Sequence, residues 1–91
     1  MKDTSLGQLI RARRKELKLT IDDLAKKVGV DRTYIGKIEK QGILPLPEVL
    51  TKIIKNLNDD HNKYIRLYKT LKVKRALKTV NQKIKSLPEK F

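Results

Sequence analysis

Apolar side chains recur at steps of three and four residues along most of the chain, which is the spacing of one face of a helix. No segment alternates as a half-buried strand does, and no Asn-Gly or Asp-Gly hairpin turn occurs. The pattern therefore predicts an all-α fold. The expected helices run over about residues 5–17 and 20–28, then from Asp31, from Pro47, and over about residues 60–86.

Capping residues support the limits of the first two helices. Ser5 followed by Gln8, and Thr20 followed by Asp23, have the spacing of capping boxes, in which two side chains bond the first free backbone N–H groups. Gly29 suits the left-handed conformation that commonly ends a helix. The second helix is therefore expected to be short and to end in a tight glycine turn.

Two short helices joined by such a turn make a helix-turn-helix. Ala25 is the small residue needed where the two helices cross, and Gly29 follows it by four positions. Ile35 and Ile38 form the inward face of the second helix of the pair. These residues together are a stronger signal than the glycine alone.

The composition indicates a negatively charged binding partner. The 91 residues, enough for one small domain, include 23 Lys and Arg against 10 Asp and Glu, a net charge of +13 with a pI near 10.2. Such an excess indicates DNA, RNA or an acidic membrane surface. Aromatic residues form only 4% of the chain, fewer than a protein that stacks single-stranded bases usually has.

The final third of the chain, residues 59–91, is the more basic part, with 10 basic and 3 acidic side chains. An apolar stripe with coiled-coil spacing runs along its expected helix. The stripe can pack on its own domain or pair with a second copy, and the lysines around it can add affinity for the DNA backbone. We expect it to form a dimer through Val73, Leu77, Val80 and Ile84. A membrane role ranks last because the stripe is narrow and lacks tryptophan.

The segments "IRARRKELKLT", "LAKKVGV", "YIGKIE" and "LPEVLTKI" resemble the helix-turn-helix domain of Cro and C1-type phage repressors over residues 6–57. The resemblance implies a five-helix, lambda-repressor-like bundle in which helix 3, about residues 32–40, enters the DNA major groove. It also implies that Arg14 of helix 1 pairs with Glu39 at the end of helix 3. We assign that pair to the fold rather than to DNA reading.

The sequence departs from the family pattern in four places, and each concerns a contact with the DNA backbone or a helix end. Ile21 replaces a glutamine that grips a phosphate, so backbone N–H groups of that turn would have to serve. Lys18 replaces a glycine, which costs about 1 kcal/mol if its backbone is left-handed. Lys40 and Gln41 stand where one residue is usual, and Leu46 replaces a capping serine.

Helix 3 supplies the expected base-reading residues. Arg32 can make a bidentate contact with guanine, and Lys37, one turn later, can reach a second base or a phosphate. Thr33 can touch a thymine methyl group or a phosphate. The expected contacts with the DNA backbone or the groove edge are Thr20, Ile21, Tyr34, Lys40 and Gln41. The alternative is that these are ordinary solvated helix residues.

The sequence contains no motif that indicates an enzyme. The chain has no cysteine, a single histidine in His61, no G-x-S-x-G and no phosphate-binding glycine loop. We therefore expect no catalytic site, no metal site and no cofactor. The absence of a secretory signal and of an apolar run of about 18 residues predicts a cytoplasmic, nucleoid-associated protein.

We expect a sequence-specific regulator of transcription that binds double-stranded DNA, with residues 1–58 as the DNA-binding domain and residues 59–91 as a basic, dimer-forming helix. A dimeric repressor is the favoured form, since a lone module presents few base-reading side chains. The alternative is an antitoxin or adaptor that uses the same fold to bind a protein. Arg32 and Lys37, with no acidic residue between them, favour DNA.

Overall fold

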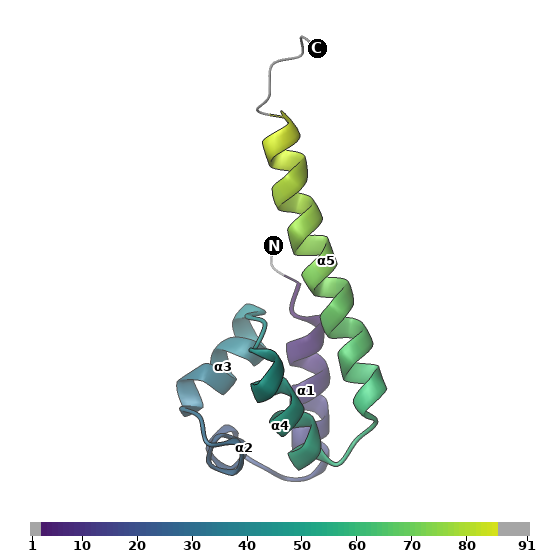
Figure 1. The fold of residues 1–91 in the computed structure, drawn as a ribbon. Coiled ribbons are helices and arrows are strands. Elements are labelled where there is room, and N and C mark those ends of the chain that lie inside the picture. The colour runs from purple at the N-terminus through teal and green to yellow at the C-terminus, as the bar shows by residue number, and fades with distance from the viewer. Residues whose placement is uncertain (1–2, 86–91) are drawn as a thin grey trace.

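A computed structural model describes residues 3–85 of the protein, with side chains from residue 3 to residue 78. This part of the chain forms five helices and no strand, which confirms the predicted all-α fold (Figure 1). The helices are α1 (Ser5–Glu16), α2 (Ile21–Val28), α3 (Arg32–Gln41), α4 (Pro47–Leu57) and α5 (His61–Lys85).

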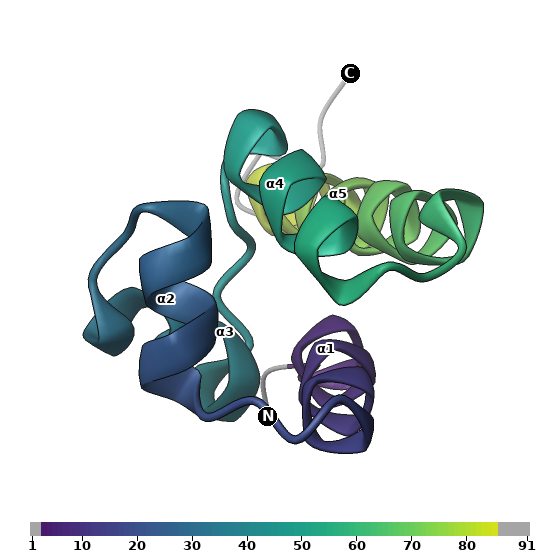
Figure 2. The ribbon, with the colours of Figure 1, turned by 90° about the horizontal axis from the view of Figure 1, so that it is seen from below.

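One hydrophobic core joins all five helices. Seen from below, α2 and α3 lie on one side of the molecule, α4 and α5 on the other, and α1 beside them (Figure 2). The core contains Ala25 of α2 and the expected inward residues of α3, Ile35 and Ile38. The buried apolar side chains are Leu6, Ile10, Leu24, Ala25, Val28, Ile35, Ile38, Leu50, Ile53, Ile54, Leu57, Tyr64, Tyr68 and Leu71.

The predicted capping box of α2 and the predicted start of α3 at Asp31 are confirmed. The Thr20 hydroxyl accepts from the Asp23 N–H at 3.0 Å, and the Asp23 carboxylate accepts from the Thr20 N–H at 2.9 Å. Gly29 ends α2 with φ +85°, in the left-handed region. Asp31 then accepts from the Thr33 N–H at 2.7 Å and begins α3.

The capping box predicted from Ser5 and Gln8 is wrong. Thr4 is the N-cap of α1 and makes no side-chain capping bond, while the Ser5 N–H and hydroxyl both donate to Asp3. The Gln8 amide instead donates to the Glu39 carbonyl at 3.3 Å. The Gln8 side chain therefore donates to a carbonyl on α3 instead of accepting from the backbone N–H at the start of its own helix.

The ends of α1 and α4 follow from their residues. Lys18 has φ +59°, so the left-handed position after α1 is occupied by a lysine, as the sequence suggested. Pro47 is in the first turn of α4, where its missing N–H is not needed. Leu46, the N-cap of that helix, makes no side-chain capping bond.

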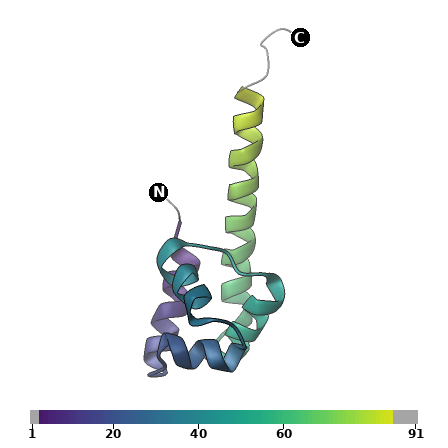
Figure 3. The same ribbon diagram turned by 90° about the vertical axis from the view of Figure 1, so that its left-hand side faces the viewer.

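The two halves of α5 have different surroundings. Its first turns pack Tyr64, Tyr68 and Leu71 into the core, and the rest of the helix projects beyond the other four helices (Figures 1 and 3). Val73 and Leu77 are 56% and 54% exposed, so they do not pack on their own domain. The side chains of Val80 and Ile84 lie outside the described residues.

Candidate nucleic-acid interface

The turn between α2 and α3 is built from short-range contacts. The N–H groups of Gly29 and Val30 both donate to the Ala25 carbonyl, at 2.8 and 3.0 Å. These bonds close the turn, while Ile35 and Ile38 bury the inner side of α3 against the core. The opposite side of α3 is left facing solvent.

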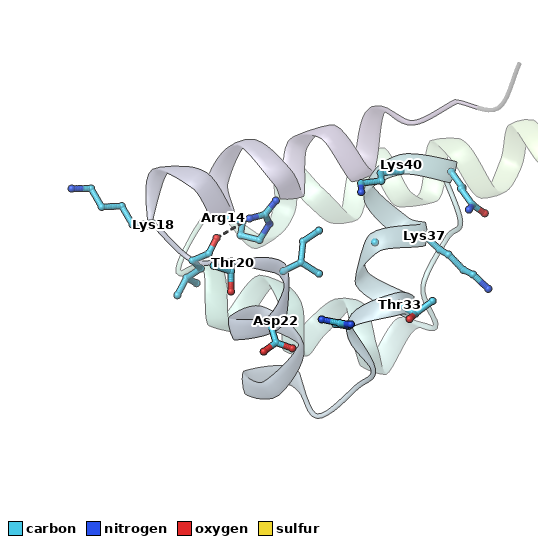
Figure 4. A pocket seen from close by; sticks show the side chains of 12 residues that line it. Arg14, Lys18, Thr20, Asp22, Thr33, Lys37 and Lys40 are labelled. Carbon is cyan, nitrogen blue, oxygen red and sulfur yellow. Dashed lines mark hydrogen bonds between the residues drawn. The ribbon is translucent and has the colours of Figure 1, made fainter.

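An open hollow of about 720 Å³ lies between this outer side of α3 and the beginning of α2 (Figure 4). The end of α1 completes its rim. The hollow is lined by Arg14, Lys18, Leu19, Thr20, Ile21, Asp22, Arg32, Thr33, Gly36, Lys37, Lys40 and Gln41. Most of the residues predicted from the sequence to contact DNA are therefore brought to one surface.

The proposed base-reading residues Arg32, Thr33 and Lys37 are all exposed and all line the hollow. Lys37 points outward from α3 in Figure 4, and Lys18 points outward at the opposite rim. Lys40 and Gln41, at the C-terminal end of α3, are exposed on the same surface. Their positions fit contact with a long groove better than enclosure of a small molecule.

The charge of the hollow is mainly positive. Lys18, Arg32, Lys37 and Lys40 are exposed cations along its lining, and Asp22 is the one carboxylate among the lining residues. Asp22 also has a cationic neighbour, since its carboxylate lies 3.5 Å from the Lys26 ammonium. A surface of this composition attracts phosphate groups.

Tyr34 and Ile21 are placed differently from their neighbours. Tyr34 is half-buried, and its hydroxyl accepts from the Leu46 N–H at 3.2 Å, so it joins α3 to the beginning of α4. A second hollow of about 300 Å³ lies beside it, lined by Thr33, Tyr34, Lys37 and Ile43. Ile21 is half-buried against the core and lines the main hollow.

Thr20 combines a structural contact with a position in the hollow. Its hydroxyl accepts from the Asp23 N–H and retains a hydrogen to donate. The Thr20 N–H, and to a smaller extent the Thr20 hydroxyl, lower the pKa of the Asp23 carboxyl, because a hydrogen bond to the charged carboxylate stabilises it. The capping contact therefore keeps a negative charge at the positive end of α2.

Arg14 and Glu39 meet behind the hollow. The Arg14 Nε and Nη2 atoms donate to the two Glu39 carboxylate oxygens at 2.8 and 2.9 Å. Its Nη1 atom donates to the Leu19 carbonyl at 2.7 Å, the bond that is dashed in Figure 4. The two side chains are 8% and 1% exposed. This bidentate pair ties α1 to α3 and to the segment before α2.

Sequence reasoning missed the residues that hold the C-terminal end of α3. Gln8 from α1 donates to the Glu39 carbonyl, and Arg75 from α5 donates to the Gly42 carbonyl at 2.6 Å. Both partners are more than 30 positions away in the chain. No local spacing signals such contacts, because they depend on how the helices pack.

The described residues hold neither a metal-binding cluster nor a membrane-spanning helix. They contain no group of three His, Cys, Asp or Glu side chains able to hold a metal ion, and His61 is exposed. Within the same residues, no helix is long and apolar enough to cross a membrane.

Comparison with known proteins gives two findings. A family profile described as "Helix-turn-helix" matches residues 10–58. The ImmF control region 10 kDa protein of Bacillus phage phi105 is 40% identical over 57 residues, a segment that covers 63% of this chain and 63% of that protein. No solved structure matches the chain significantly.

Proposed function

Because the chain belongs to the Cro/C1-type helix-turn-helix family of DNA-binding proteins, we propose that it is a dimeric repressor that reads a specific duplex sequence with α3. The family and the phage control-region relative support a DNA-binding regulator of transcription. Repression, dimer formation and sequence specificity are the finer parts of the proposal. Such a protein would act where chromosomal DNA is accessible, in the cytoplasm and on the nucleoid.

The main support for this proposal is the set of residues on the outer side of α3. The inner side of α3 is fixed by buried contacts, and its outer side carries Arg32, Thr33 and Lys37. Binding of DNA therefore costs little backbone entropy at these residues. We propose that Arg32 and Lys37 read base edges, and that Thr33 contacts a thymine methyl group or a phosphate.

The surrounding residues are proposed as backbone contacts. Lys40 and Gln41 extend the exposed surface of α3, and the Thr20 hydroxyl and the first-turn N–H groups near Ile21 lie across the hollow. Tyr34 is proposed at the groove edge, where its hydroxyl can donate to a phosphate while it accepts from Leu46.

Base reading and backbone contact are separated by a matched pair of variants. Arg32→Ala should weaken binding to a duplex selected from a random pool by about 1–3 kcal/mol, and weaken binding to random duplex much less. Lys40→Ala should weaken both alike. Equal losses in the two duplexes for Arg32→Ala would assign Arg32 to phosphate.

Salt tests the electrostatic basis of the same binding. With about 6–10 phosphate contacts, affinity should fall about 10³- to 10⁵-fold between about 50 and 200 mM salt. Fluorescence anisotropy with a labelled duplex measures this directly. An affinity that does not change over this range would reject DNA binding and leave the protein-binding alternative, antitoxin or adaptor, as the better account.

The exposed stripe on α5 supports a dimer. Val73 and Leu77 face solvent, and covering them with a second copy would remove apolar surface from water. Lys72, Lys74 and Lys78 flank them, so two such helices repel each other until salt screens the charges. Salt should therefore strengthen the dimer while it weakens DNA binding.

Sedimentation velocity in low and high salt tests the dimer. Removal of residues 59–91 is unsuitable, because it would delete Tyr64, Tyr68 and Leu71 from the core. The double variant Val73→Ser with Leu77→Ser leaves that core intact and should shift the protein toward monomer. A wild-type protein that stays monomeric in high salt would remove the dimer from the proposal.

A further inference from the structure

The C-terminal end of the proposed recognition helix is held from outside. A helix leaves its last carbonyl groups without partners in the helix itself. In the last turn of α3 the Glu39 carbonyl accepts from the Gln8 amide, and directly after the helix the Gly42 carbonyl accepts from the Arg75 guanidinium. The Arg75 contact, at 2.6 Å, is the shorter one.

The surroundings of Gly42 are tight. Its φ of +71° is in the left-handed region, and a Cβ at this position would lie 2.6 Å from the Asp3 carbonyl oxygen. The Arg75 Nη2 atom lies 3.5 Å from the same Asp3 oxygen. Three segments therefore converge here, the N-terminal segment, the end of α3 and the middle of α5.

A second contact from α5 reaches the far end of the same loop. The Tyr68 hydroxyl donates to the Pro45 carbonyl at 2.8 Å, in a buried position. Tyr68 and Arg75 are seven residues apart, so they project from one side of α5. Together they hold residues 42–46, which connect α3 to α4.

We infer that Arg75 is a positioning residue for DNA binding, which fixes the C-terminal end of α3 and the loop after it without touching DNA itself. This inference rests on the proposed function. Lys40 and Gln41 are immediately before Gly42 and are exposed on the proposed DNA surface. A contact that fixes the backbone of Gly42 therefore also restricts the positions of Lys40 and Gln41.

The physical reason is a charged donor on a helix terminus. The carbonyl end of α3 carries a partial negative charge, and a guanidinium N–H makes a charge-assisted bond with it. When that donor is removed, the Gly42 carbonyl bonds to water and the loop gains freedom. DNA binding must then order the loop, which lowers the affinity.

A matched pair of variants tests the inference on the full chain. Arg75→Gln removes the charged donor, and Lys74→Gln removes the same charge from the neighbouring exposed residue. The probes are a duplex selected by the wild-type protein and a random duplex. Arg75→Gln should weaken binding to the selected duplex about 3- to 10-fold more than Lys74→Gln does.

The dependence of affinity on salt separates positioning from direct contact. If Arg75 acts through the loop, Arg75→Gln leaves the slope of log affinity against log salt at the Lys74→Gln value. A slope smaller by about 1 for Arg75→Gln alone would place Arg75 on a phosphate and overturn the inference. Equal affinities for the two variants would overturn it as well.

Amide hydrogen exchange tests the contact without DNA. Exchange at the Gly42 and Ile43 N–H groups should be faster in Arg75→Gln than in the wild type, and unchanged in Lys74→Gln. Unchanged exchange in both variants would overturn the inference even if DNA binding proves correct. Faster exchange in a protein that binds no duplex would instead reject the proposed function alone.

A conservative variant covers the case in which Arg75→Gln does not fold, as judged by circular dichroism. Arg75→Lys keeps a charge and a donor but lacks the planar, forked guanidinium. It should bind the selected duplex more weakly than the wild type does, and exchange at its Gly42 N–H should be faster. Wild-type affinity together with faster exchange at Gly42 would show that the contact does not affect DNA binding and would overturn the positioning role.

Discussion

Arg13 and Arg14 are neighbours on α1, yet each ties that helix to a different half of the molecule. Arg14 points toward α3 and pairs with the buried carboxylate of Glu39. Arg13 points toward the junction of α4 and α5, where it donates to the carbonyls of Leu57 and Asn58, each at 3.0 Å. One helix therefore joins the half that carries α3 to the half that carries α5.

The two contacts differ most in their access to water. The Arg14 pair is enclosed, and every buried side-chain nitrogen and oxygen among the described residues has a hydrogen-bond partner. The Arg13 side chain is 25% exposed, and its ion pair with Glu16 is on the surface. Since water screens exposed charges, the comparison predicts that similar substitutions have very different effects at the two sites.

Glu39→Gln should have the largest effect on stability. It leaves the Arg14 charge buried without its counter-ion, which should lower the free energy of unfolding by about 3–5 kcal/mol. Glu16→Gln breaks an exposed pair of the neighbouring arginine and should cost less than about 1 kcal/mol. Urea unfolding measures both, and equal losses would remove burial as the explanation.

Gly7→Ala should have the next largest effect, because the backbone of α3 lies directly against α1 at this glycine. A Cβ at Gly7 would overlap the Ile38 carbonyl oxygen, so the helices must separate and the Arg14–Glu39 pair must stretch. We expect a loss of about 1–3 kcal/mol.

Gly36→Ala is the control for this substitution. It also replaces a helical glycine, but a Cβ at Gly36 meets no atom within 4 Å. It should stabilise the protein by about 0.5–1 kcal/mol through helix propensity. Thermal unfolding of the two variants should therefore shift in opposite directions.

Arg13→Met should cost about 1–2 kcal/mol, less than the change at Glu39. Two charge-assisted bonds to carbonyls at the end of α4 are lost, but water reaches the site and partly replaces them. Lys15→Met removes the same charge from an exposed neighbour and should change stability little. A loss larger than that of Glu39→Gln would reverse the comparison.

Acid titration at Asp59 should show the smallest effect. A bond from the Tyr64 hydroxyl, then the Asp60 N–H and the Lys63 ammonium, lowers the pKa of Asp59 to about 2. Because this pKa lies below the value of 3.8 for the free side chain, its contribution is present above about pH 4 and is lost as the pH falls to about 2.

Asp59→Asn should therefore be less stable than the wild type at neutral pH, and the difference should close between about pH 4 and 2. Urea unfolding at several pH values measures it. Glu48→Gln, on the exposed first turn of α4, is the matched loss of one carboxylate. A difference between Asp59→Asn and the wild type that persists at pH 2 would contradict the assigned cause.

Local chemistry made much of the fold predictable. The Thr20–Asp23 box, the Asp31 cap, the left-handed Gly29 and the Pro47 start all depend on contacts within about four residues. Such contacts form wherever the residues occur together, so spacing alone identifies them. The outer side of α3 was predictable for the same reason, since helical periodicity separates Arg32, Thr33 and Lys37 from the buried face.

Prediction from local spacing failed where helix packing brought a distant hydrogen-bond partner to a side chain. Gln8 has the spacing of a capping residue, but packing brought the Glu39 carbonyl within its reach. The Tyr34 hydroxyl similarly found the Leu46 N–H, and the Arg75 guanidinium found the Gly42 carbonyl. None of these contacts leaves a pattern in the sequence.

The amino-acid sequence by itself determined the helices, most of their ends and the core-facing sides of α2 and α3, because these depend on periodicity and short-range bonds. Only the tertiary structure decided that α5 enters the core with its first turns and then holds the loop after α3. A side chain that reaches across 33 positions finds its partner through the packing of whole helices, and that arrangement exists only once the core has formed.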